Sequence, residues 1–94
     1  MTDLQCPAIV VLIAGDAAAP SWLSRVAAEF VVDGDAADLG RLVEESTDLF
    51  RGETFVVRAA LSRIREILRK RGIPSDPPVA VEVDSSGWRL ALPG

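Results

Sequence analysis

Apolar side chains recur at helical spacing between residues 57 and 68 and give the chain its clearest element. The apolar positions, which fall on one face of a helix, are Val57, Ala60, Leu61, Ile64, Ile67 and Leu68. Gly72 and Pro74 follow where such a helix would end, Gly72 as the residue just past the last turn. We therefore predict an amphipathic helix over residues 54–70.

Two short alternating segments follow this helix. Residues 79–83 and 88–92 alternate apolar and polar side chains on either side of Asp84-Ser85-Ser86-Gly87. Two such segments around a glycine-containing turn predict a β-hairpin. The alternation puts Trp88 on the side that faces the helix, so we expect it in the core and not in a site.

The first half of the chain predicts one strand and two helices. Residues 8–14 are apolar and rich in β-branched side chains, as in a buried strand. Apolar side chains at helical spacing after Pro20 predict a helix over residues 21–31. A further helix is predicted over residues 36–50, with Asp35 as its cap. Gly40 weakens that prediction, because glycine disfavours a helix interior.

Charge is distributed unevenly along the chain. Residues 1–50 carry nine acidic and two basic side chains, residues 51–94 carry eight basic and five acidic, and the net charge is −4. Residues 58–71 contain six basic side chains and one acidic side chain. This separation indicates two faces with different partners. A solvated helix surface without a partner gives the same pattern.

Several kinds of chemistry lack the residues they need. The 94 residues contain no histidine and one cysteine, Cys6, so a histidine-based triad, a histidine–zinc site and an intrachain disulfide are excluded. Glu44-Glu45 and Asp33-Gly34-Asp35 lack the spacing of a catalytic pair or a calcium loop. We expect no enzyme, no cofactor and no metal.

Length and hydropathy predict a single domain over residues 1–94, with residues 1–7 flexible. No apolar run reaches the ~20 residues that cross a bilayer. Asp3 precedes the apolar run 8–14 without a basic neighbour, which differs from a signal peptide. We expect a cytoplasmic protein without a membrane partner.

Two stretches of the basic half occur in a recognisable order. Residues 57–65 read Val-Arg-Ala-Ala-Leu-Ser-Arg-Ile-Arg, and residues 87–90 read Gly-Trp-Arg-Leu. Together, residues 54–92 resemble the recognition helix and wing of the OmpR/PhoB-type winged-helix effector domain. The resemblance implies an α+β winged-helix-like fold with three helices, an N-terminal strand and a C-terminal β-hairpin wing. It also implies a bacterial-type DNA-binding regulator of transcription whose third helix, in a helix-turn-helix arrangement, enters the major groove.

The resemblance also implies which residues bind DNA. Arg58, near the helix start, would be closest to base edges, where a guanidinium can pair with guanine. Arg63 and Arg65 match family positions that contact phosphates. Ser62 and Arg69 complete the predicted DNA-binding set on the same helix.

Carboxylates favour an alternative hypothesis. Glu82 and Asp84 lie on the predicted wing, where they would repel phosphates, and the isoelectric point is about 4.6. The alternative is a protein–protein interaction or oligomerisation module on a winged-helix-like fold that does not bind DNA. Its partner would be another protein or a second copy of the chain. A weaker possibility is an acidic mimic of DNA built on residues 33–48.

Overall fold

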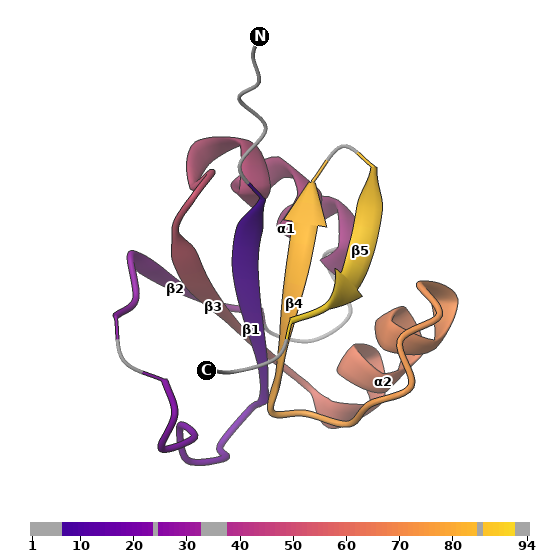
Figure 1. Cartoon of the computed structure of the whole chain (residues 1–94). Helices are drawn as coiled ribbons and strands as arrows, with labels where there is room; N and C mark the ends of the chain where they lie inside the picture. The colour runs from indigo at the N-terminus through magenta and orange to yellow at the C-terminus, as the bar shows by residue number, and fades with distance from the viewer. Residues whose placement is uncertain (1–6, 24, 33–37, 85, 92–94) are drawn as a thin grey trace, which may run out of the picture.

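The computed structural model describes residues 7–23, 25–32, 38–84 and 86–91. In these ranges five strands and two helices follow one another as β1 (Ala8–Ala14), β2 (Ala28–Val31), α1 (Leu39–Leu49), β3 (Thr54–Ala59), α2 (Leu61–Lys70), β4 (Val79–Asp84) and β5 (Gly87–Leu90). The strands form one mixed sheet in the order β2-β3-β1-β4-β5. Both helices pack on the same face of this sheet (Figure 1).

Strand β1 lies at the centre of the sheet. It pairs in parallel with β3 and antiparallel with β4, so that Val11 lies between Val56 and Ala80. The outer strands β2 and β5 extend the sheet beyond β3 and β4. β1 is apolar throughout because both of its faces are covered and both of its edges are paired. The predicted strand over residues 8–14 is confirmed.

The main core lies between the sheet and the two helices. Its fully buried members come from alternate positions of the strands and from one stripe of each helix, and include Val10, Leu12, Val43, Phe55 and Ile64. The helices approach closely at Gly40, where a Cβ atom would lie 3.1 Å from Cδ1 of Ile67. This close approach explains a glycine at a position where helix propensity disfavours it.

The other face of the sheet is covered by irregular chain. Val11, Ile13, Val56 and Ala80 form a second apolar cluster there, packed against Leu23. Arg58 of β3 binds residues 15–17, the first part of this irregular chain after β1. Its Nη1 donates to the carbonyl oxygens of Gly15 at 3.1 Å and Ala17 at 2.7 Å, and its Nε pairs with Glu29 at 2.7 Å.

The predicted winged-helix arrangement is wrong. The described residues contain two helices, and the N-terminal strand and the C-terminal hairpin belong to the same five-stranded sheet. β4 pairs with β1 over five residue pairs, from Ala8 with Val83 to Leu12 with Val79, so the hairpin does not project as a wing. The fold is α+β, with a sheet as its organising element.

The predicted helix over residues 21–31 is also wrong. Residues 28–31 form β2, in which Ala28 and Phe30 pack on the main core while Val31 is 66% exposed. A two-residue period and a helical period overlap over so short a run. Packing decides between them, because the ring centroid of Phe30 lies 6.1 Å from that of Phe50 and 5.9 Å from that of Phe55.

The predicted helix over residues 54–70 begins too early. Residues 54–59 form β3, and α2 begins at Leu61 after Ala60 alone. The stretch 54–57 is rich in β-branched and aromatic side chains, which favour a strand, and it fits between β1 and β2. The predicted end is confirmed, because Gly72 has a φ of +73° just past the last turn.

The remaining predictions concern α1, the hairpin and the termini. α1 lies inside the predicted helix 36–50, and Oδ1 of Asp38 caps it by accepting from the N–H of Arg41 at 3.2 Å. The hairpin is confirmed as β4 and β5. Asp35, the predicted cap, lies outside the described residues, as do residues 1–6 of the predicted flexible segment and Leu92.

Candidate functional site

The predicted DNA-contact residues lie on two different faces of the molecule. Ser62, Arg63, Arg65 and Arg69 belong to α2, whereas Arg58 belongs to β3. The Arg58 side chain is 19% exposed and is held by Glu29 and two backbone carbonyl groups on the face opposite the helices. It therefore does not share a surface with the arginines of α2.

The arginine of the hairpin also lies on the face opposite the helices. Arg89 is the register partner of Glu82 and pairs with Glu82 at 3.1 Å and Asp84 at 2.7 Å. The Arg89 guanidinium, together with the backbone N–H of Ser86, lowers the pKa of Asp84 to about 2. Asp84 in turn raises the pKa of Arg89. Both carboxylates of the hairpin thus pair with its own arginine.

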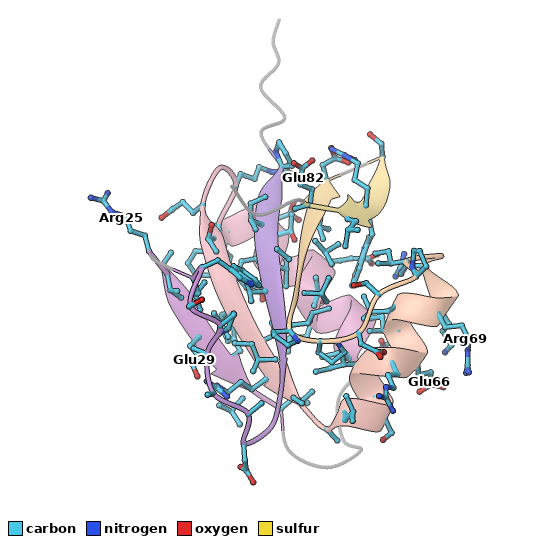
Figure 2. The ribbon with its side chains drawn as sticks, turned by 60° about the horizontal axis from the view of Figure 1, so that its bottom comes forward. Arg25, Glu29, Glu66, Arg69 and Glu82 are labelled. Carbon is cyan, nitrogen blue, oxygen red and sulfur yellow. The ribbon has the colours of Figure 1, made fainter. Side chains whose placement is uncertain are left out.

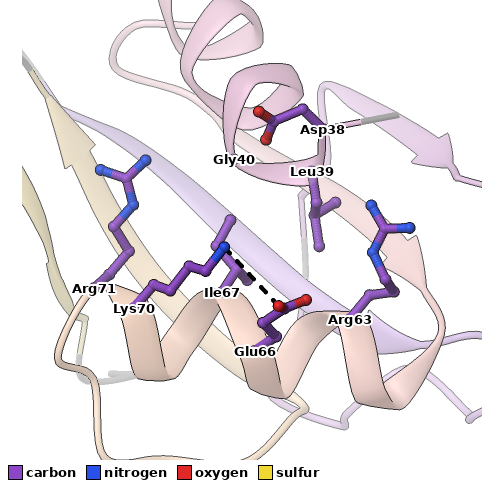
Figure 3. Close-up of a pocket in the computed structure, with 8 residues that line it drawn as sticks. All are labelled: Asp38, Leu39, Gly40, Arg63, Glu66, Ile67, Lys70 and Arg71. Carbon is purple, nitrogen blue, oxygen red and sulfur yellow. Dashed lines mark ion pairs between the residues drawn. The ribbon is translucent and has the colours of Figure 1, made fainter. Parts of the chain in front are cut away.

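α2 presents its charged side chains in two rows. Arg63, Glu66 and Lys70 face the groove between α1 and α2 (Figure 3). Arg65 and Arg69, the Arg65–Arg69 row, face the loop that leads to β4. Residues 61–71 contain five basic side chains and one acidic side chain. Glu66 and Arg69 point away from the sheet (Figure 2).

The groove between the helices has a volume of about 510 Å³ (Figure 3). Its cations face carboxylates: Nζ of Lys70 lies 3.9 Å from Glu66, and Arg71 pairs with Glu44 at 2.8 Å. Asp38 already caps the first turn of α1. These contacts reduce the attraction of the groove for an anionic ligand.

A second hollow, the C-terminal hollow, lies at the end of α2. It has a volume of about 640 Å³ and is lined by Arg65, Leu68, Arg69, Gly72, Ile73, Pro74, Ser75 and Asp76. Nε of Arg65 lies 3.3 Å from Oδ1 of Asp76, and both side chains are more than half exposed. Arg69 makes no ion pair with any residue that the structure describes.

The described part of the chain assembles no cluster of three or more acidic, cysteine or histidine side chains that could hold a metal ion. Its buried polar side chains are Ser46 and Thr47, and Oγ1 of Thr47 donates to the carbonyl oxygen of Val43 at 2.9 Å. This bond satisfies the hydroxyl within α1. In the same ranges no helix has the length and apolar character needed to cross a membrane.

Fold and surface together define a small α+β domain whose second helix presents basic side chains to solvent. Comparisons with protein-family models, curated proteins and solved structures find no match for this chain. The functional assignment therefore depends on the surface of the molecule.

Sequence reasoning found the arginines of α2 but not the hollow beside them. The available signal was Gly72 followed by Ile73 and Pro74, which predicts that the chain turns back against the last turn of the helix. In the structure the N–H of Ile73 donates to the carbonyl oxygen of Leu68, which brings these two residues together. Asp76 then comes within reach of Arg65.

Proposed function

We propose that the chain is a protein-binding module that uses α2 to contact an acidic segment of a partner protein. The carrying observation is Arg69, an exposed arginine without an ion pair among the described residues. Arg65 lies one turn away, and its exposed pair with Asp76 is of a kind that contributes little stability. A carboxylate of the partner can therefore replace Asp76 at small cost.

Carboxylates beside α2 disfavour a nucleic-acid duplex. The neighbouring helix α1 carries Glu44, Glu45 and Asp48, whose side chains are about half exposed or more. A duplex is wider than one helix and would bring phosphates close to these carboxylates. Arg58 and Arg89 face the other side of the sheet. A short acidic peptide, in contrast, can follow the Arg65–Arg69 row alone.

Double-stranded DNA is the second candidate ligand. Residues 61–71 contain five basic side chains and one acidic side chain, and such a concentration of positive charge favours DNA as the ligand. In this case the chain is a regulator of transcription that uses Ser62, Arg63, Arg65 and Arg69 of α2. For both candidates we place the chain in the cytoplasm. Its single cysteine cannot form an intrachain disulfide, the kind of bond that is common in proteins of oxidising compartments.

Fluorescence anisotropy with two labelled probes, a short oligoglutamate peptide and a random DNA duplex, separates the candidates. At ~20 mM salt, where charge contacts are strong, we expect the peptide to bind. Arg69→Glu should weaken this binding about tenfold, because it replaces an attractive charge with a repulsive one. Circular dichroism establishes that the variant is folded.

Arg25→Glu is the matched control. Arg25 is also exposed and without an ion pair among the described residues, and it lies on the opposite side of the molecule from Arg69 (Figure 2). The control has the same net charge as Arg69→Glu and should bind the peptide within about twofold of the wild type. Equal loss in both variants, or no peptide binding at ~20 mM salt, would overturn the proposal. Duplex binding that persists at ~150 mM salt and is lost in Arg69→Glu would assign the function to DNA instead.

A further inference from the structure

We infer that the acidic segment of the partner carries a large apolar side chain, and that this side chain enters the C-terminal hollow beside Arg65 and Arg69. The inference rests on the proposed function and adds the chemical class of the partner. The partner segment would combine carboxylates with one apolar anchor residue.

Apolar groups form much of the hollow. Leu68 is 1% exposed and Ile73 is 6% exposed, so these two residues form its floor. Pro74 is exposed and contributes to the wall, together with the aliphatic stems of Arg65 and Arg69. A volume of about 640 Å³ accommodates a leucine or phenylalanine side chain with part of its backbone.

Backbone hydrogen bonds define the shape of the hollow. The N–H of Ile73 donates to the carbonyl oxygen of Leu68 at 2.9 Å, and the N–H of Ser75 donates to that of Ile73 at 3.0 Å. Gly72 provides the positive φ that this turn requires. Because the hollow is formed before a ligand arrives, binding loses little conformational entropy in the protein.

The charges around the hollow select an acidic segment. Arg65 and Arg69 lie one helical turn apart and both line the hollow. Guanidinium groups bind carboxylates with paired, charge-assisted hydrogen bonds. Asp76 competes for Arg65 at 3.3 Å, so its removal should leave Arg65 available to the partner. An apolar ligand without carboxylates would leave both arginines unused.

Two oligoglutamate peptides of equal charge, one with a central leucine and one with a central serine, test the inference. We expect the leucine peptide to bind at least about fivefold more tightly than the serine peptide. Asp76→Asn should strengthen binding of both peptides about threefold, a gain that misfolding cannot produce.

Two phenylalanine variants locate the anchor. Ser75→Phe fills the hollow and should remove the preference for the leucine peptide. Ser21→Phe adds the same side chain to an exposed position outside both α2 and the hollow and should preserve the preference.

The outcomes separate failure of this inference from failure of the proposed function. Equal affinity for the two peptides, with continued dependence on Arg69, would overturn the apolar anchor and leave the protein-binding function standing. Failure of both peptides to bind would overturn the proposed function itself.

Two further outcomes concern other occupants of the hollow. Displacement of the leucine peptide by octanoate at a similar concentration would assign the hollow to a small carboxylate. A dimer that forms with concentration and blocks the peptide would assign it to a second copy, and either result overturns the inference.

Discussion

The guanidinium carbon of Arg71 lies 4.6 Å from the centroid of the Trp88 ring. Nη2 of the same arginine pairs with Oε2 of Glu44 at 2.8 Å, and Nε1 of Trp88 donates to that oxygen at 3.2 Å. One polar cluster therefore connects α1, the end of α2 and β5. The hairpin is attached to the helices by this cluster as well as by the sheet.

Replacing Trp88 with leucine removes the ring and its hydrogen bond but keeps an apolar side chain. We expect the free energy of unfolding to fall by about 1–2 kcal/mol, from the lost cation–π contact and hydrogen bond. Urea denaturation, monitored by circular dichroism, measures this change in the free energy of unfolding. Trp22→Leu is the control, because Trp22 is 39% exposed and should change stability by less than about 0.5 kcal/mol. Equal effects of the two variants would contradict a stabilising role for the cluster.

Arg58→Met tests the attachment of residues 15–17 to the outer face of the sheet. The variant keeps the apolar stem but removes the donors to Gly15, Ala17 and Glu29. We expect a loss of about 2–3 kcal/mol in unfolding free energy, because these bonds involve a charged and largely buried group. Hydrogen exchange should quicken at the N–H of Gly15, which donates to Ala59.

Arg41→Met provides the comparison for Arg58. Arg41 is 77% exposed in its pair with Glu45 one turn away in α1. Its loss should change the free energy of unfolding far less than the loss of Arg58, because the pair is screened by solvent, and should leave exchange at residue 15 unchanged. Faster exchange at residue 15 in Arg41→Met as well would show that the effect is not specific to Arg58.

The pair of Asp84 and Arg89 makes stability depend on acidic pH. The pKa of Asp84 is lowered from 3.8 to about 2, chiefly by the hydrogen bonds from Arg89. Because the folded-state pKa lies below the unfolded-state pKa, the pair stabilises fully above about pH 4 and loses its contribution as the pH falls through about 2. The difference in Tm between the wild type and Asp84→Asn should therefore be constant above about pH 4 and shrink toward pH 2. A difference that stays constant down to pH 2 would contradict this linkage.

Gly72→Ala tests the turn that forms the C-terminal hollow. The φ of +73° is costly for any residue with a Cβ atom, although an added Cβ atom would meet no other atom within 4 Å. We expect a loss of about 1 kcal/mol in unfolding free energy from the backbone conformation alone. Gly15→Ala is the matched control, since a Cβ atom there would also meet nothing within 4 Å and the φ of Gly15 is not positive. It should be neutral or slightly stabilising when both are compared by thermal unfolding.

Local sequence patterns predicted the elements whose secondary structure does not depend on contacts with distant residues. Strand β1, the hairpin and the end of α2 follow from apolar runs, alternation and Gly72. β2 and β3 were not predictable in the same way, because their spacing also fits a helix. Contacts of Phe30 with Phe55 decide the outcome, and these residues are far apart in the sequence.

The candidate site was also predictable only in part, because some of its residues come from distant parts of the sequence. The arginines of α2 follow from one helical face, but their neighbours come from elsewhere. Arg65 pairs with Asp76 eleven residues away, and Arg58 pairs with Glu29 twenty-nine residues away. No local pattern reports such pairs, so exposure and partner were available only from the three-dimensional structure.

The central place of β1 has a consequence for synthesis of the chain. Its residues leave the ribosome well before those of its two neighbours in the sheet, β3 and β4. Until residues 79–84 emerge, the most apolar strand of the molecule has at least one unpaired edge, which is a template for aggregation. Sheets that depend on such distant pairings also form slowly. During synthesis of this protein, an edge of its most apolar strand therefore stays exposed until residues 79–84 are available to pair with it.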